Sequence, residues 1–424
     1  MSTVDPDAVS AAGSSGWPGE GTHRIPFGVY NNEALHRLEL ERLFYRGHWH
    51  YVGLEAEVPA VGDFKRTVVG ERSVVMTRAA DGAIHVVENV CKHRGMQFCR
   101  ERHGNRKEFV CPYHQWSYTL SGDLQGVPFR RGVRQDGKVN GGMPADFDTK
   151  QHGLTKLRVA TRGGVVFATF DHEMESLEDF IGPSVLRWFD RLFNGRRLTI
   201  LGYNRQRIPG NWKLMQENIK DPYHPGLLHT WFVTFGLWRA DNKAELQMDA
   251  RHRHAAMIST RGAMGAASQV TQVSSFKETM KLHDDRFLDI VPEHWWGGPT
   301  AVMTTLFPSV ILQQQVNSVS TRHIQPDGHG HFDFVWTHFG YEDDDEAMTL
   351  RRLRQANLFG PAGFVSADDG EVIEMCQEAF ERARQGQGQA LAELGGREVG
   401  PTDHMVTETL IRGMYRYWRE VMQA

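Results

Sequence analysis

The sequence predicts an α+β protein with an N-terminal all-β domain and a larger C-terminal domain, in which helices surround an antiparallel sheet. At 424 residues, the chain exceeds the usual domain size of about 100 to 200 residues. From residue 51 to residue 166, short runs of β-branched residues are cut by Gly, Asp and Pro, as in small antiparallel β domains. Beyond Phe167, stretches with helical periodicity alternate with strand-like stretches. The expected units are residues 1–49, a leader and a helix that packs on the second domain, residues 50–166 and residues 167–424.

A helix is expected before the β domain, over residues 32–49. Asn32 can cap its start, and five apolar side chains fall mostly on one of its faces: Leu35, Leu38, Leu40, Leu43 and Phe44. In the second domain, helical periodicity occurs at residues 175–194, 342–358, 370–385 and 405–422. Strands are expected at residues 198–207, 301–326 and 331–341, and an exposed loop at residues 386–396.

The composition is that of a large globular enzyme. Hydrophobic residues make up 40% of the chain and aromatic residues 10%, which argues against a disordered scaffold. The formal charge is only -4 and no long basic run occurs, so no nucleic-acid or anionic-membrane partner is indicated. No apolar stretch approaches the roughly 18 residues of a membrane span, and the N-terminal stretch lacks the pattern of a secretory signal. The four cysteines imply no disulfide framework, so a cytoplasmic protein is expected.

The most informative stretch runs from Cys91 to Trp116 and carries two matched pairs of metal ligands. A Cys-x-His pair, Cys91 and His93, precedes a Cys-x2-His pair, Cys111 and His114. Each pair combines one thiolate with one imidazole. This suits a [2Fe-2S] cluster with both cysteines on one iron and both histidines on the other, which is the Rieske arrangement. A structural Cys2His2 zinc site is the alternative, although zinc sites usually group ligands of one type together.

A second candidate metal site follows in the next domain. Asp221, His224 and His229 occur within nine positions, beside two helix-breaking prolines. Two imidazoles and one carboxylate are the ligands of a mononuclear non-haem Fe(II), which keeps positions open for dioxygen and substrate. The carboxylate can be Asp221 itself, or Asp368 or Asp369 far downstream. An ordinary packed or surface pair of histidines is the alternative, but a one-electron centre upstream needs an acceptor to reduce.

Both sites resemble those of the large (α) subunit of Rieske non-haem iron aromatic-ring-hydroxylating oxygenases, and the resemblance spans nearly the whole chain. It implies a catalytic domain of the helix-grip type and two cofactors, a Rieske [2Fe-2S] cluster and a mononuclear Fe(II) held by His224, His229 and a distal aspartate. The family's ligand, a carboxylate followed five residues later by Glu, matches Asp369 rather than Asp368. Asp221 matches the family's bridging aspartate, which links a cluster histidine of one subunit to an iron-ligand histidine of the next.

Within that family, three sequence blocks look closest to the branch that acts on aromatic carboxylates, the salicylate 5-hydroxylases and terephthalate dioxygenases. This resemblance implies hydroxylation of salicylate to gentisate with O2. Electrons would come from NAD(P)H through a ferredoxin reductase and a ferredoxin, and a small β subunit would complete an α3β3 assembly. Another benzoate-type ring dioxygenase is the alternative within the family.

An aromatic acid in an apolar pocket needs a cation or hydrogen-bond donors opposite its carboxylate, because an unpaired buried charge is costly. The candidates are Gln315, Arg322, Ser366 and Arg412. For each arginine, a structural salt bridge is the alternative, since Arg at the end of an element commonly pairs with a local carboxylate.

Two readings from other classes also stay open. A Rieske electron-transfer protein would need only the β domain and would leave the second domain unexplained. A zinc-stabilised binding protein would lack the visible charge-transfer absorption of an iron–sulfur protein.

Overall fold

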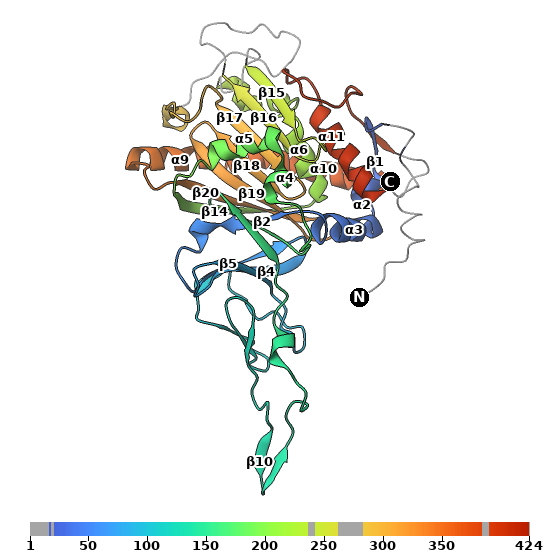
Figure 1. The fold of residues 1–424 in the computed structure, drawn as a ribbon. Coiled ribbons are helices and arrows are strands. Elements are labelled where there is room, and N and C mark those ends of the chain that lie inside the picture. Colours follow the sequence, from blue (N-terminus) through green and yellow to red (C-terminus); the bar gives the residue numbers. More distant parts are fainter. Residues whose placement is uncertain (1–16, 18–20, 236–241, 262–282, 384–389, 424) are drawn as a thin grey trace. The chain divides into compact units, whose positions relative to one another are not determined.

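The computed structural model describes residues 17, 21–235, 242–261, 283–383 and 390–423. The chain separates into two compact units, one of residues 45–174 and one of residues 1–44 together with 175–424 (Figure 1). In the described residues, the unit of residues 45–174 is built of strands, and the other unit combines α-helices with an antiparallel sheet, so the predicted α+β class is confirmed. The domain limits predicted from the sequence separate the chain by expected function and not by contacts, so they remain a prediction. In the described ranges, no helix is both long enough and apolar enough to cross a membrane.

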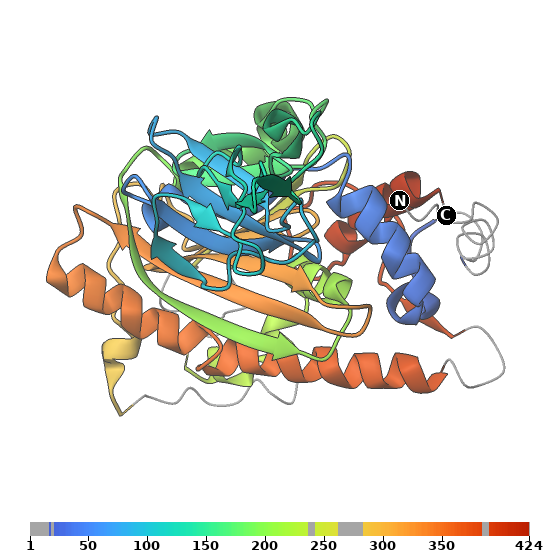
Figure 2. The same cartoon turned by 90° about the horizontal axis from the view of Figure 1, so that it is seen from below.

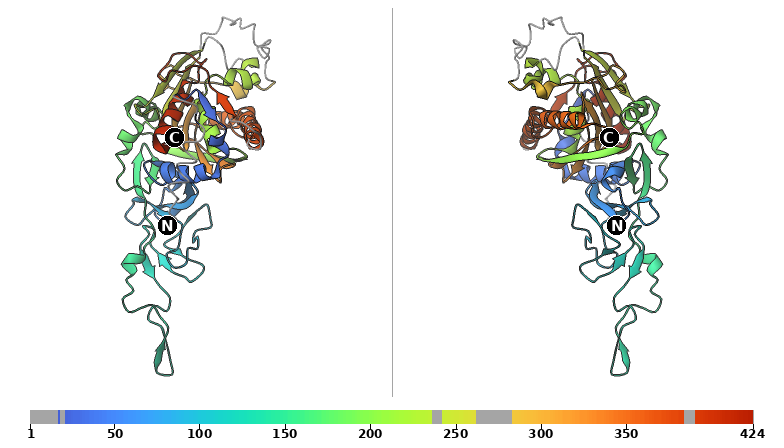
Figure 3. Two further views of the ribbon diagram at one scale, coloured as in Figure 1. Left: turned by 90° about the vertical axis from the view of Figure 1, so that its right-hand side faces the viewer. Right: turned by 90° about the vertical axis from the view of Figure 1, so that its left-hand side faces the viewer.

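The unit of residues 45–174 is made of small antiparallel sheets, as its β-rich runs predict. A four-stranded sheet has the order β5 (Ile84–Glu88), β4 (Arg72–Arg78), β3 (Asp63–Val69), β6 (His103–Asn105). Two three-stranded sheets have the orders β12 (Arg158–Arg162), β13 (Val165–Thr169), β2 (His50–Leu54) and β7 (Phe109–Val110), β8 (Ser117–Tyr118), β9 (Leu124–Gly126). A separate hairpin of β10 (Val133–Gln135) and β11 (Lys138–Asn140) extends from the rest of this unit (Figures 1 and 3).

The other unit is built on one antiparallel sheet of seven strands. In sheet order these are β14 (Leu198–Ile208), β20 (Phe332–Tyr341), β19 (Ser318–Pro326), β18 (Val310–Gln315), β17 (Ala301–Leu306), β16 (Ala255–Thr260) and β15 (Lys243–Met248). The strand-like stretch 301–326 supplies three neighbouring strands, because the chain turns back after β17 and again after β18.

Helices cover both faces of this sheet. On one face, α5 (Pro183–Leu192) packs on β15, β16 and β17, where Trp188 meets Ala256, Ile258 and Val302. The opposite face carries α6 (Trp212–Lys220), α9 (Glu346–Phe359), α10 (Phe364–Ala383) and α11 (Thr409–Met422). Figure 2 shows α9 and α10, in orange tones, running along this side of the sheet. The second face is the one that carries the candidate site.

The structure corrects two local predictions. The helix expected at residues 175–194 is divided into α4 (Leu177–Ile181) and α5, because Gly182 adopts a φ of 76° and Pro183 starts a new helix. Residues 386–389 of the expected loop lie outside the described residues. Within the rest of it, Leu391–Glu393 forms β21 and pairs with β1 (Arg24–Pro26), so a loop is wrong for that part. The partner strand lies at the other end of the chain, where no local pattern could reveal it.

The predicted N-terminal helix is confirmed as α3 (Glu33–Glu39) with a π-helical turn to Phe44, but it ends there, so a helix is wrong for residues 45–49. The side chain of Asn32 caps it and accepts hydrogen bonds from two backbone N–H groups, at 2.9 and 3.2 Å. At its other end, the fully buried Glu39 accepts a hydrogen bond of 2.9 Å from Lys213 of α6. Glu39 also accepts from the indoles of Trp212 and Trp418. Burial lowers the pKa of Lys213, and Glu39 opposes that shift. This ion pair therefore fixes α6, the helix that leads into the Asp221–His229 stretch.

We expect Lys213→Met to lower the free energy of unfolding by about 3 to 5 kcal/mol, because it leaves Glu39 buried and charged without its partner. The double variant Lys213→Met/Glu39→Gln should recover part of this loss, since neither charge then remains. Urea unfolding followed by circular dichroism measures both. Equal stability of Lys213→Met and the parent protein would contradict the role of the pair.

Candidate functional site

Cys91 and Cys111 begin two loops that share one backbone hydrogen-bond frame. In each loop, the N–H of the cysteine donates to the carbonyl five residues later, at 2.9 and 2.8 Å. The N–H four residues after each cysteine donates back to the carbonyl of that cysteine, at 2.9 and 2.8 Å. That fourth residue has positive φ in both loops, 74° at Gly95 and 57° at Gln115. The backbone thus shapes both loops alike, and it presents the two Cys/His pairs as a matched set.

The thiols and imidazoles of these loops are arranged in two layers. Cys91 and Cys111 are each only 2% exposed and lie in an apolar cluster of the β unit. Burial raises the pKa of the Cys111 thiol, and the adjacent Cys91 thiol raises it further. The less buried rings of His93 and His114 have centroids 4.4 Å apart. Nδ1 of His93 is buried and has no hydrogen-bond partner among the described residues, so it is free to ligate. Two inner thiols and two outer imidazoles fit a Rieske cluster.

The second site brings together three side chains from two distant segments. His224 and His229 flank the short helix α7 (Pro225–Leu228), and Asp369 lies in the second turn of α10. One ligand atom from each of these three residues lies within 4.8 Å of the other two. Asp369 Oδ1 is 3.6 Å from Nε2 of His224 and 3.3 Å from Nε2 of His229. This set of donors fits a divalent metal that binds nitrogen and oxygen and keeps open positions.

A carboxylate stands behind each histidine of this site. Asp368 Oδ2 lies 3.1 Å from Nδ1 of His229, the ring nitrogen opposite the one that faces Asp369. Asp221 Oδ2 lies 3.2 Å from Nδ1 of His224. Contacts of this kind orient a ligating imidazole and fix its tautomer. Asp368, which the sequence left as a possible ligand, is therefore placed to orient His229, while Asp369 shares the ligand cluster.

The charged side chains of the second site balance one another. Burial acts to lower the pKa of His224, but Asp221 and Asp369 raise it to about 9. Burial acts to raise the pKa of Asp369, but the two histidines hold it far below its usual range. Asn218 of α6 adds a hydrogen bond of 3.0 Å to Asp369 Oδ1. The carboxylates favour a positive charge at this position, which a bound metal cation would supply in place of the proton on His224.

A cavity lies beside this cluster. Six lining residues alternate along β16 to β19 and so share one face of the sheet: Met257, Ser259, Ala301, Met303, Gln315 and Arg322. The remaining walls carry the three candidate ligands, three further polar residues (Asn218, Asn242 and Thr300) and an apolar group: Ile219, Pro222, Pro225, Val316, Phe359, Val365 and Met405. Such a lining suits a flat apolar ligand with few polar groups.

Arg322 is the unusual member of this lining. Its side chain is 2% exposed, and its guanidinium makes no hydrogen bond or ion pair with a residue that the structure describes. The ring of Trp336, its neighbour across β19 and β20, lies 3.9 Å from Cζ. Burial lowers the pKa of Arg322 to about 9, and Asp369 opposes the shift. The alternative of a structural salt bridge therefore finds no partner here. A buried cation without a counter-ion in a cavity favours an anionic ligand.

Of the other candidate substrate contacts, one lines the cavity and two do not. Gln315 lines the cavity, and its Oε1 accepts a hydrogen bond of 2.5 Å from Gln313. Ser366 is buried elsewhere and donates to Gln206 at 2.7 Å. The guanidinium of Arg412 donates to the backbone carbonyls of residues 395 and 398. Neither Ser366 nor Arg412 is among the described residues that line the cavity, so the structure does not support substrate contacts by these two.

Several residues of the site were not singled out from the sequence. Asn218 lies one helical turn before Asp221, and this spacing could have indicated it. Met257 and Phe359 come from strand and helix faces that only the folded chain brings to the cavity.

Comparisons with known proteins agree with both centres. Residues 48–136 match the Rieske [2Fe-2S] domain family, and residues 191–424 match the family of ring hydroxylating alpha subunits, catalytic domain. The chain is 74% identical over 407 residues to the large oxygenase component of salicylate 5-hydroxylase from a Ralstonia species, with 96% of each chain covered. It is 40% identical to the large subunit of anthranilate 1,2-dioxygenase from Burkholderia cepacia, covering 96% and 95%. The fold is similar to that of naphthalene 1,2-dioxygenase with bound indole, with a TM-score of 0.76, 23% identity and coverage of 96% and 93%.

We expect Asp369→Ala to lose the mononuclear metal, because it removes one of the three candidate ligands that the described residues supply. Asp368→Ala should keep the site but weaken metal affinity by roughly 10- to 100-fold, since it removes only the group that orients His229. Iron per chain, measured beside the EPR signal of the reduced cluster, distinguishes the two. Equal iron loss in both variants, or full iron in Asp369→Ala, would contradict these assignments.

A stability change is expected at the second cluster loop. Gln115→Gly should raise the free energy of unfolding by about 1 kcal/mol, because a left-handed conformation costs a non-glycine residue roughly that amount. Gln115→Ala is the matched control and should bring no gain. The temperature at which the visible cluster absorption is lost provides the measurement, and a gain in both variants would show that backbone strain is not the cause.

Proposed function

Because this chain belongs to the family of Rieske ring-hydroxylating oxygenases, as a large (α) subunit, we propose that it converts salicylate to gentisate. The observation that carries the substrate class is the buried guanidinium of Arg322, which has no ion-pair partner among the described residues and lies in the cavity next to the candidate iron ligands. The 74% identity to the salicylate 5-hydroxylase component supports the choice of acid. In this reaction one oxygen atom of O2 enters the ring and the other leaves as water, with uptake of two electrons and two protons. A Rieske electron-transfer protein and a zinc-binding protein are set aside, since the second unit matches the catalytic family.

The chain's own residues divide the work between the two units. Cys91, Cys111, His93 and His114 would hold the Rieske cluster, and His224, His229 and Asp369 would hold the Fe(II). When bound, these centres supply electrons and activate dioxygen. The hydrogen bond between Asp368 and Nδ1 of His229 orients that ring and fixes its tautomer, and the Asp221 carboxylate lies 3.2 Å from Nδ1 of His224.

Substrate positioning falls to the cavity walls. Arg322 pairs with the carboxylate of the acid, and Gln315 is placed to contact the same group or the adjacent hydroxyl. The apolar walls enclose the ring and exclude water, which strengthens the charge pair. Anchored in this way, the ring presents the carbon para to its hydroxyl toward the metal ligands.

The active form requires partners. A ferredoxin and an NAD(P)H-dependent reductase supply the electrons, and a small β subunit completes an α3β3 assembly in the cytoplasm. Asp221 is the bridge in this scheme. It lies at the end of α6 beside His224, and its carboxylate would also accept a hydrogen bond from a cluster histidine of the next subunit.

Reconstitution with ferredoxin and reductase tests the activity directly. Salicylate should yield gentisate, while anthranilate and terephthalate should yield little product. A cis-dihydrodiol from terephthalate, or catechol from anthranilate, with no gentisate from salicylate, would instead make the chain a dioxygenase of another aromatic acid.

We expect Arg322→Leu to weaken salicylate binding by about 2 to 4 kcal/mol, roughly 30- to 700-fold in Kd, because it removes the charge opposite the carboxylate. Arg322→Lys should keep part of the affinity, since the positive charge remains. Phenol, which has no carboxylate, serves as the control ligand and should bind all three proteins alike. An unchanged salicylate Kd in Arg322→Leu would place the anchor elsewhere.

A separate defect is expected in Asp221→Asn. Both metal centres should remain loaded, but turnover should nearly stop, because the change removes the charge that orients imidazoles on both sides of the subunit boundary. Stopped-flow spectra should show a reduced cluster that stays reduced when substrate and oxygen are present. Reoxidation at the parent rate would refute the bridging role.

A further inference from the structure

The turn between β18 and β19 holds a residue in an unfavourable conformation. Gln315 pairs with Ser318, so Val316 and Asn317 form a two-residue hairpin turn. Val316 has a φ of 47°, whereas Asn317 is not among the residues with positive φ. A turn with positive φ only at its first central position favours Gly there. A β-branched residue at this position is strained, so other contacts must hold it.

Asn317 supplies the first of these contacts. It is fully buried, and its side-chain amide forms a closed pair with the backbone of Val291, accepting at 3.0 Å and donating at 2.7 Å. Its N–H donates to Gln355 of α9 at 2.7 Å, and its carbonyl accepts from Arg352 at 2.5 Å. Every polar group of this residue therefore has a partner, so the turn cannot relax locally without breaking hydrogen bonds.

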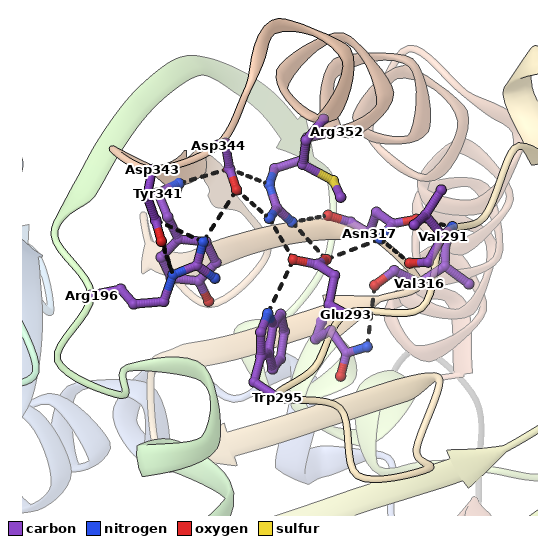
Figure 4. A network of polar contacts seen from close by, with 12 residues as sticks. Arg196, Val291, Glu293, Trp295, Val316, Asn317, Tyr341, Asp343, Asp344 and Arg352 are labelled. Carbon is purple, nitrogen blue, oxygen red and sulfur yellow. Dashed lines mark hydrogen bonds and ion pairs between the residues drawn. The ribbon is translucent and has the colours of Figure 1, made fainter.

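Arg352 extends these contacts to two buried carboxylates, and we call Asn317, Arg352, Glu293 and Asp344 together the clamp (Figure 4). Its guanidinium donates to Glu293 at 3.1 and 2.7 Å and to Asp344 at 2.7 and 2.9 Å. Glu293 in turn accepts from the amide of Asn317 at 3.0 Å and from the indole of Trp295 at 3.0 Å. The side chains of Arg352, Glu293 and Asp344 are 1%, 7% and 5% exposed, so water competes little for these bonds. The network joins α9, the segment before β17 and the strained turn into one rigid part.

The strained residue faces the cavity. Val316 packs on Phe359 and Val365, and all three belong to the cavity lining. Its neighbour Gln315 lines the same cavity. A glycine at position 316 would satisfy the turn without strain, but it would leave this part of the wall open. Valine is therefore present in a strained backbone conformation at a position where its side chain narrows the cavity.

We propose that Val316 is a specificity-determining residue that limits the cavity to one-ring aromatic acids, and that Arg352 and Asn317 are positioning residues that hold it there. This inference rests on the proposed function, since it concerns which aromatic acid the site accepts. It requires that loss of the Val316 side chain broaden the selectivity, and that glycine at this position give a more stable protein than alanine.

The test compares Val316→Gly with Val316→Ala in the complete oxygenase. The two acids are salicylate and 1-hydroxy-2-naphthoate, which has the same adjacent carboxylate and hydroxyl on two fused rings. Both variants should raise kcat/KM for the naphthoate relative to salicylate by tenfold or more. Only glycine relieves the strain, so Val316→Gly should have a higher unfolding temperature than Val316→Ala. Unchanged selectivity in both variants would overturn the proposal, as would a less stable glycine variant.

The clamp is tested by Arg352→Lys, which keeps the charge but loses the paired geometry, with Asn317→Ser as a second variant should the first fail to fold. Each should relax selectivity in the parent protein and have little further effect in the Val316→Gly background. Equal effects in both backgrounds would show that the clamp does not act through Val316. Failure of the proposed function has a different signature. If the parent makes no gentisate, the same ratio is measured with the one-ring acid that it does convert.

Discussion

The contact between α10 and the turn that follows α6 is the constraint on which the catalytic unit depends. It places Asp369 against His224 and His229, with Asp368 and Asp221 behind the two rings. Neither segment could hold this arrangement alone, because three buried charged or polar groups must be brought together with their partners in place. Further residues hold these ligands in place. Asn218 bonds the ligand carboxylate, and the buried pair of Glu39 and Lys213 fixes the helix that carries Asn218.

The cavity beside the candidate iron site contains a buried positive charge, that of Arg322. The carboxylates of the candidate iron site are paired with imidazoles, whereas the guanidinium of Arg322 across the cavity lies on the face of Trp336 and makes no hydrogen bond or ion pair with a described residue. An aromatic ring supports a guanidinium without neutralising it, so the cation stays available to an incoming anion. The strained Val316 narrows the same cavity from another side. Charge and shape thus select together, one for the acid group and the other for the size of the ring.

The sequence alone predicted those features that depend on residues close together in the chain. The Cys-x-His and Cys-x2-His pairs, the paired histidines and the helical or strand periodicity predicted the fold class and indicated where to look for ligands. Contacts made by tertiary structure were beyond it. The pairing of Leu391–Glu393 with Arg24–Pro26 joins opposite ends of the chain. Arg322 and Arg412 looked equivalent as sequence positions. Only the fold shows that carbonyl groups satisfy Arg412, whereas Arg322 faces a cavity and has no hydrogen-bond partner in the part of the chain that the structure describes. The left-handed Val316 carries no signal at all, since valine is a residue that sequence patterns assign to strands.

Insertion of one atom of dioxygen into an aromatic acid anchored beside the candidate Fe(II) ligands can be followed with labelled oxygen. The experiment is a single turnover of the fully reduced oxygenase with salicylate and 18O2. We expect gentisate that carries one 18O atom, in the hydroxyl para to the original one, with a yield that approaches one per mononuclear iron. Gentisate whose new oxygen comes from water, or a product with two labelled oxygen atoms, would contradict this expectation.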